Sequence, residues 1–318
     1  MRRRALTLLE FVEHHSGSNS HALHFVGHST GGLDVRLLLT PGVKLGQVSA
    51  EDSIAARTKT AITLGTPHYG TPLANTLTNL NGRNWLMLVT ALATSKPGRY
   101  TLYGAARALT LWSRVDDFIL GHTHTLLDSI VERLIKDIKP DADDSFFDFV
   151  RSVGVDQGAL VQLTPESIDL FNAAVLDRAD IDNVSFATAA PFPKPYVGWD
   201  PYKMMSRGLF ALSYSLARRE QRQYPYPDHA YELLEEIRNL LPFELDRGTN
   251  DGVVPTLSQL WGRFGGIAVA DHLDVVGQFP HDDEGGVHYP GWLHSGSNFS
   301  KNDFAELWSK IAAVIANA

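Results

Sequence analysis

The feature that most constrains this chain is a glycine-flanked serine between a short strand and a helix. Residues 22–26 (ALHFV) form an apolar run typical of a strand, and residues 27–32 (GHSTGG) follow as a turn that opens a helix ending at Leu39. A second apolar run, over residues 60–64, comes after that helix. A strand, a helix and a further strand in this order predict a parallel βαβ unit and therefore an α/β fold.

The rest of the chain alternates helical and strand patterns. Apolar spacing predicts an amphipathic helix over residues 4–15 and a largely helical region over residues 75–183. Within that region Thr164 before Pro165 is typical of a helix start. Further strands are expected at residues 184–189 and 266–270, and a closing helix at residues 304–316.

Composition excludes several classes of function. The 318 residues include 28 basic and 36 acidic ones, a net charge of −8, which provides no basic field for nucleic acid. The absence of cysteine excludes disulfides, a cysteine nucleophile and cysteine-ligated metals. The longest uncharged apolar runs are about half a membrane span, and Glu10 interrupts the only candidate signal-peptide core. We expect a soluble chain without a targeting signal, whose export depends on any sequence upstream.

The turn at residues 27–32 contains the pattern G-x-S-x-G, which presents a serine nucleophile when it lies between a strand and a helix. The serine then lies on a strained turn, and we expect Gly27 and Gly31 to let strand and helix pass closely. The plainer interpretation is that Ser29 only caps the helix. A serine hydroxyl also needs a base and a carboxylate that orients the base.

Among thirteen histidines, His272 is the preferred base, because it follows the strand expected at residues 266–270. Open α/β sheets place their sites at the carboxyl ends of strands. The alternative is a loop histidine that pairs with Asp271 or Asp274.

The preferred acid is Asp251, within residues 248–255 (GTNDGVVP). The same residues also read as an ordinary turn. Asp246 and Asp200 remain alternative acids.

Several separate segments carry a resemblance to a known family. They are HFVGHSTGGLDVRLLL, TLGTPHYGTPLA, QLTPES, GTNDGVVPTLSQLWG and ADHLDVVGQF, which together extend from residue 22 to about residue 282. The chain resembles lipases of the α/β-hydrolase fold, in particular bacterial triacylglycerol lipases, and the order Ser29, Asp251, His272 is that of the family. The resemblance implies a mostly parallel sheet flanked by helices, with a core at 1–75 and 184–318 and a helical lid or cap at 76–183. The core would include a further insert at about 192–245.

The resemblance also implies a reaction. Ser29, His272 and Asp251 would hydrolyse carboxylic esters of acylglycerol-type lipids through an acyl-enzyme, with no cofactor for the chemistry. The partners would be an ester or lipid substrate and the surface of lipid aggregates. The alternatives are a short-chain carboxylesterase or polyester depolymerase, or a truncated lipase-like protein of weak or no activity.

One oxyanion donor can be named, the backbone amide of Thr30 at the start of a helix. The family takes its second donor from a loop after an early strand, and only 28 residues precede Ser29. We therefore expect a chain that begins in the middle of the fold, with its first strand at a sheet edge, and that hydrolyses esters less well than a version extended upstream.

The resemblance further implies a structural calcium ion near the base. In one group of bacterial lipases the ligands are an acid two residues after the histidine, a glutamine six residues after it and a backbone carbonyl ten residues after it. Asp274, Gln278 and Asp282 occupy those positions. Oxygen ligands suit calcium, while the plainer alternative is a hydrogen-bonded loop.

Overall fold

The structure is a computed structural model that describes residues 1–16, 21–46, 48–78, 158–194, 196–199, 201–221, 225–282, 288–289 and 293–318. The strands are β1 (Leu23–His28), β2 (Thr58–Leu64), β3 (Asp182–Ala189), β4 (Arg263–Val269), β5 (His281–Asp282) and β6 (His288–Tyr289). The α-helices are α1 (Arg2–Ser16), α2 (Thr30–Leu39), α3 (Val48–Arg57), α4 (Pro72–Thr78), α9 (Gly158–Val161), α10 (Pro165–Ala174), α11 (Pro201–Gln221), α12 (Asp228–Ile237) and α13 (Lys301–Ala316). Short 3-10 helices are η1 (Arg238–Leu240), η2 (Thr256–Gln259) and η3 (Asp274–Val276).

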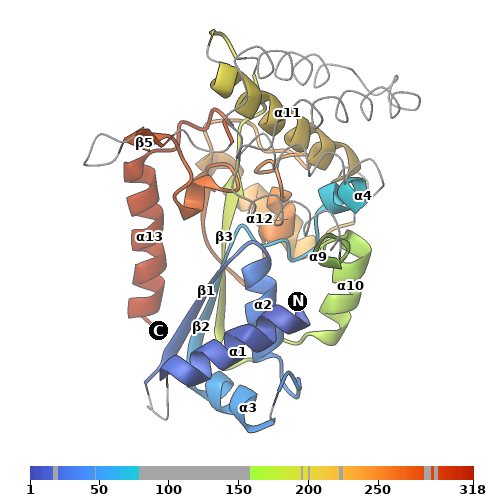
Figure 1. Cartoon of the computed structure of the whole chain (residues 1–318), viewed down its shortest axis with the longest axis vertical. Helices are drawn as coiled ribbons and strands as arrows, with labels where there is room; N and C mark the ends of the chain where they lie inside the picture. Colours follow the sequence, from blue (N-terminus) through green and yellow to red (C-terminus); the bar gives the residue numbers. More distant parts are fainter. Residues whose placement is uncertain are drawn as a thin grey trace, which may run out of the picture.

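Strands β1 to β4 form one parallel sheet in the order β1-β2-β3-β4. His28 at the end of β1 pairs with Leu64 of β2, and Leu64 pairs with Phe186 of β3. In Figure 1 the carboxyl ends of these strands point toward α11, and their amino ends lie near α3. The parallel sheet flanked by helices confirms the α/β class predicted from the βαβ pattern.

The expected strands are present with shifted ends. β1 extends beyond the predicted residues 22–26, because Gly27 and His28 stay paired with Thr63 and Leu64 of β2. The ladder therefore leads directly into the serine turn. The apolar helical stretches expected between residues 79 and 157 lie outside the described residues, and the division into core and lid stays a prediction.

The sheet is covered on both faces, and the period of two along β2 separates them. Ala61 packs in a cluster with α1, α2 and α3, whereas Ile62 and Leu64 pack in a cluster with α13. Ala187 of β3 lies on the Ala61 face and packs against α12. Figure 1 shows α13 on one side of the strands and α2 on the other.

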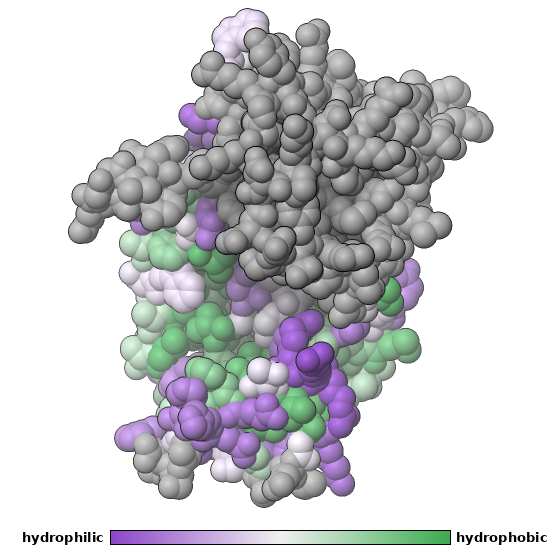
Figure 2. Space-filling model, in the orientation of Figure 1, coloured by the Kyte–Doolittle hydropathy of each residue, from purple (hydrophilic) through white to green (hydrophobic). Residues whose placement is uncertain are grey.

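The helices bury one side and expose the other. In α1, Ala5 and Leu9 are buried, while Arg3 and Glu13 are exposed. Figure 2 accordingly shows hydrophilic residues over α1 at the lower end of the viewed face. None of the helices in the described residues is both long and apolar enough to span a membrane.

Two helix starts show how local sequence sets the boundaries. Thr164 caps α10, since its hydroxyl accepts the amide of Ser167 and Pro165 takes the first helical position, as predicted. The closing helix begins at Lys301 instead of residue 304. A capping box explains the earlier start, because Ser300 and Asp303 satisfy each other's backbone amides.

β1 lies at one end of the sheet and pairs only with β2 among the described residues. Val26 on this strand is 36% exposed. The expected edge position of the first strand is therefore observed in the described part of the chain. Its consequence for the site is that Ser29, which follows β1, lies near one side of the sheet.

Candidate active site

Ser29 lies in a strained turn between β1 and α2. Its backbone has φ 53° and ψ −128°, a conformation that costs a non-glycine residue about 1–3 kcal/mol. The amide of Ser29 donates to the carbonyl of Leu64 at 2.9 Å, which ties the turn to β2. The side chain of Ser29 makes no capping hydrogen bond to α2, so the alternative of a simple helix cap does not describe its geometry.

The glycines around Ser29 have unequal steric roles. A Cβ atom on Gly27 would lie 2.6 Å from the Cα of Gly32, so strand and helix meet there too closely for any side chain. A Cβ atom on Gly31 would have no atom within 4 Å, so the expectation that Gly31 is needed for close passage is wrong. Gly32 has that role, because its Cβ atom would lie 2.2 Å from the hydroxyl of Thr66 on the loop after β2.

The structure brings Ser29, His272 and Asp251 into one hydrogen-bonded chain. The Oγ atom of Ser29 lies 2.9 Å from Nε2 of His272, and Nδ1 of His272 lies 2.8 Å from Oδ2 of Asp251. The amide of His272 also donates to the carbonyl of Asp251 at 3.0 Å. Ser29 follows the carboxyl end of β1, and His272 lies on the loop after β4. Asp251 lies on the loop between η1 and η2.

Asp251 is fully buried yet held ionised. Its Oδ1 atom accepts the amides of Val253 and Val254, at 2.9 and 2.7 Å. Burial alone would raise the pKa of Asp251, but the His272 imidazole and these donors outweigh it and lower the pKa below its usual value. A buried carboxylate that keeps its charge can orient an imidazole and stabilise its protonated form.

His272 is buried beside this charge. Burial lowers the pKa of His272, but the charge of Asp251 and the hydrogen bond to it raise the pKa above the usual histidine value. With Nδ1–H donating to Asp251, the neutral ring presents its Nε2 lone pair to the hydroxyl of Ser29. The ring is therefore arranged to take a proton from Ser29.

The alternative partners of His272 are engaged elsewhere. Asp271 accepts the amides of Leu273 and Asp274 through Oδ1. Asp274 accepts the amide of Asp271 and the hydroxyl of Ser297 through Oδ2. Both carboxyls thus brace the loop that carries His272, and burial raises the pKa of each.

The alternative acids do not compete with Asp251 in the described residues. Asp246 forms an ion pair with Arg218, whose Nη1 lies 2.9 Å from Oδ1 of Asp246. Asp200 lies outside the described residues.

Two polar residues of this network were missed in the sequence. The hydroxyl of Thr188 donates to Oδ2 of Asp251 at 2.6 Å, and Nε2 of Gln259 lies 3.2 Å from the same oxygen. Both side chains are fully buried. A usable signal existed for Thr188, which is a polar residue near the carboxyl end of a strand, where open α/β sheets place their sites. Gln259 had none, because η2 that carries it was not predicted.

Thr30, the expected oxyanion donor, is the first residue of α2. The first amides of an α-helix have no intrahelical carbonyl to bond, and the helix dipole adds partial positive charge there. The amide next to Ser29 is therefore available to an anion.

The expected calcium ligands differ in exposure. Asp274 is buried and Gln278 is exposed, while Asp282, which would bind through its backbone carbonyl, is the second residue of β5. In the described ranges no three histidine, aspartate or glutamate side chains are grouped closely enough to hold a metal ion. The calcium site stays a prediction from the resemblance.

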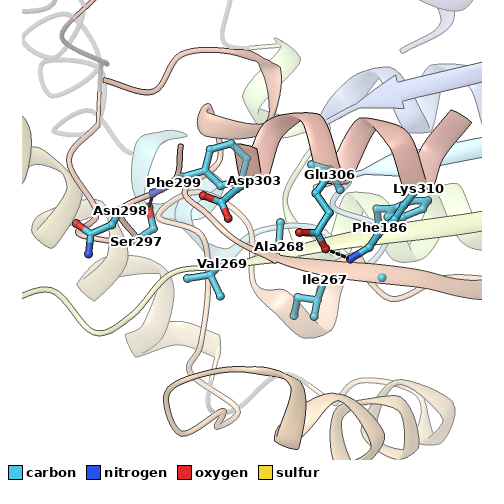
Figure 3. A pocket seen from close by; sticks show the side chains of 12 residues that line it. Phe186, Ile267, Ala268, Val269, Ser297, Asn298, Phe299, Asp303, Glu306 and Lys310 are labelled. Atoms are coloured by element: carbon cyan, nitrogen blue, oxygen red, sulfur yellow. Dashed lines mark hydrogen bonds and ion pairs between the residues drawn. The ribbon is translucent and has the colours of Figure 1, made fainter. Parts of the chain in front are cut away.

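A pocket of about 260 Å³ lies between β4 and α13 and has no part in this network. Figure 3 shows Ile267 and Val269 on its strand side, with Glu306 and Lys310 on the helix. The two charged groups form an ion pair at 2.7 Å. None of Ser29, Asp251 and His272 lines this pocket.

Comparison with known proteins adds distant structural similarity. No protein family and no curated protein matches the chain. A lipase of Staphylococcus hyicus is 17% identical over 93% of this chain and 70% of its own, with a TM-score of 0.42. Lipase 1 from Pelosinus fermentans is 16% identical over 93% and 71%, with a TM-score of 0.45. EstA from Clostridium botulinum is 18% identical over 91% and 64%, with a TM-score of 0.40. Likeness at this level carries no conclusion about activity, which has to come from the geometry of the site.

Proposed function

We propose that this chain is a serine hydrolase that cleaves carboxylic ester bonds, with Ser29 as nucleophile, His272 as general base and Asp251 as the acid that orients it. The observation that carries the proposal is the continuous hydrogen-bonded path from Ser29 Oγ through His272 to Asp251. The strained backbone of Ser29 supports it, because such strain persists where a function or the surrounding structure requires it.

The reaction follows from the positions of the protons. Nε2 of His272 takes the hydroxyl proton as Oγ of Ser29 bonds to the ester carbonyl carbon. The bond from that carbon to the leaving alcohol oxygen then breaks, and His272 gives its proton to that oxygen. Water next attacks the acyl group, His272 takes a proton from it, and the acid leaves as the bond to Oγ breaks and Ser29 regains its hydrogen.

The tetrahedral oxyanion needs donors fixed in advance, each worth about 3–4 kcal/mol. We assign one of them to the amide of Thr30. The acyl group would be attached to Oγ of Ser29, and Thr30 is the next residue, so the Thr30 amide is close to where the oxyanion forms. The partial positive charge at the start of α2 adds to the stabilisation.

We propose acylglycerol-type lipids as the substrate class. The support is an exposed apolar segment after β3, the strand whose carboxyl end faces the site. Phe192 is 60% exposed, Val197 93% and Trp199 86%. In Figure 1 this segment precedes α11 at the end of the molecule toward which the strands point. Aromatic side chains at such a surface favour contact with a lipid–water interface.

The test is hydrolysis of p-nitrophenyl butyrate and p-nitrophenyl dodecanoate by the full chain and by a Ser29→Ala variant. We expect turnover by the unsubstituted chain and a loss of about 10⁴-fold or more in the variant. Faster turnover of the dodecanoate, increased further when it is emulsified, supports a lipid substrate. A preference for the butyrate would replace it with a short-chain esterase.

A fluorophosphonate probe gives a second readout that does not depend on substrate choice. It should label the chain on Ser29, as located by mass spectrometry of the peptide, and should leave the Ser29→Ala variant unlabelled. A folded chain that neither hydrolyses the esters nor takes up the probe would contradict the proposed function.

A further inference from the structure

His28, the residue before Ser29, makes a contact that the proposed reaction does not use. Its Nε2 atom lies 2.9 Å from the backbone carbonyl oxygen of His272, which is 244 residues away in the chain. The two imidazole rings lie against each other, with centroids 4.8 Å apart and planes inclined by 41°. The turn that carries Ser29 and the loop that carries His272 are thus joined by a second contact, beside the hydrogen bond between Ser29 and His272.

The chemistry of the acceptor fixes the protonation of His28. A carbonyl oxygen only accepts hydrogen bonds, so Nε2 of His28 must carry the hydrogen. Burial is the main cause that lowers the pKa of His28 to about 4, and the charge of the nearby His272 is a second cause. The ring is therefore neutral at neutral pH, with its hydrogen on Nε2, and it adds no positive charge beside His272.

The backbone of His28 is as firmly held as its side chain. His28 is the last residue of β1 and pairs with Leu64 in the sheet. The amide of Ser29 bonds to the carbonyl of the same Leu64. A displacement of the loop that carries His272 relative to this strand end would break the contact from Nε2 to the carbonyl.

We infer that His28 is a positioning residue, whose Nε2–H holds the backbone of His272 at the distance from Ser29 that proton transfer requires. The inference rests on the proposed function, because it assigns His28 a role toward the proposed base. It needs no contact between His28 and substrate. Misplacement of a reacting group by about 1 Å can lower a rate by about 10²-fold, so one such contact can matter.

The test compares His28→Gln with His28→Met. The two side chains have similar length and both are neutral, like His28 itself at neutral pH, but only glutamine can donate from a nitrogen near the position of Nε2. We expect the methionine variant to lose about 10- to 100-fold in kcat for p-nitrophenyl butyrate, with KM within about twofold. The glutamine variant should recover most of the loss.

Melting temperatures and circular dichroism of both variants separate positioning from stability. If the two variants are equally active while both remain folded at the assay temperature, the inference is overturned. If a loss appears only in KM, it is also overturned, because a misplaced base lowers kcat.

A measurement on the unsubstituted protein covers the case in which a variant does not fold. Nitrogen-15 NMR of the imidazole should show His28 protonated on Nε2 and unprotonated on Nδ1 at pH 7. The opposite tautomer would overturn the inference. Failure of the proposed function has a different signature, since the unsubstituted chain would then neither turn over the ester nor react with the fluorophosphonate at Ser29.

Discussion

Two buried histidines of this chain differ in the charge of their neighbours. His272 lies beside a carboxylate, and His68 lies beside a guanidinium. His272 is 4% exposed and bonds to the carboxylate of Asp251, whereas His68 is 0% exposed and lies 3.3 Å from the guanidinium of Arg36 through Nδ1. The pKa of His272 is raised, because the effect of Asp251 exceeds that of burial. The pKa of His68 is lowered well below its usual value, because burial and then Arg36 both disfavour its charge.

The difference shows that burial alone does not tell which histidine can act as a base. His68 receives a hydrogen bond from Arg36 and reaches the hydroxyl of Thr63 at 3.0 Å through Nε2. Both of its nitrogens are occupied within the fold. His272 also has both nitrogens engaged, but one of its partners is the hydroxyl of Ser29, a group that can react.

The largest expected effect compares His272→Gln with His68→Gln. The first should lower kcat/KM by about 10⁴- to 10⁶-fold, because the base is removed. The second should leave kcat/KM within about tenfold and instead lower the free energy of unfolding by about 1–3 kcal/mol, because buried partners lose their hydrogen bonds. Ester assays and urea unfolding measure the two quantities. Similar losses of activity in both variants would contradict the distinction.

The next effect concerns the carboxylates near the two histidines, Asp251 beside His272 and Asp177 beside Arg36, the partner of His68. Asp251→Asn should lower kcat by about 10⁴-fold, because the amide no longer fixes the tautomer of His272 or stabilises its charge. The control is Asp177→Asn, since Asp177 pairs with Arg36 at 3.4 Å and accepts from Trp261. Its rate should change by less than about threefold, because uncoupled sites act independently. A large loss of rate in the control would show that the surroundings of His68 are coupled to those of His272.

A smaller effect is expected on stability at Arg36. This side chain is 1% exposed, and its Cζ lies 3.6 Å from the ring centroid of Trp261. Arg36→Met should lower the free energy of unfolding by about 1–3 kcal/mol, because it removes the hydrogen bonds of the guanidinium to His68 and Asn172 and leaves the buried His68 without this donor. Arg263→Met is the matched control: its ion pair with Asp182 is about half exposed, so the loss should stay below about 1 kcal/mol. Denaturant titrations that give equal losses would contradict the buried role of Arg36.

The smallest expected effect is a pair of opposite pH dependences of stability. The raised pKa of His272 contributes stability that is present below pH 6.5 and is lost as the pH rises through the folded pKa. The lowered pKa of His68 has the opposite sign, because its contribution is present above pH 6.5 and is lost as the pH falls. The stability difference from the unsubstituted chain should therefore shrink with rising pH for His272→Gln and with falling pH for His68→Gln. Unfolding curves between pH 5 and 9 test this, and slopes of the same sign would refute it.

Much of the sheet could be predicted from local patterns. The apolar runs at 60–64 and 184–189 lie within β2 and β3, and the strand at 266–270 overlaps β4. Their ends shifted by a few residues, because strand ends depend on pairing with neighbours that the local sequence does not contain. α3, α11 and α12 were not predicted, although the buried Ala230, Leu234 and Ile237 of α12 recur at the spacing of one helix face.

The amino-acid sequence alone predicted the strand, the serine turn and the helix, because glycine spacing and apolar periodicity act over a few residues. It also placed His272 at the carboxyl end of a strand. The packing of distant segments selects Asp251, and neither Asp271 nor Asp274, as the carboxylate that faces His272, and it makes Gly32 rather than Gly31 the point of close approach. It alone brought His28 to the carbonyl of His272 across 244 residues. The physical reason is that parallel strands gather their carboxyl ends at one edge, while strand register and loop conformation select which side chains meet there.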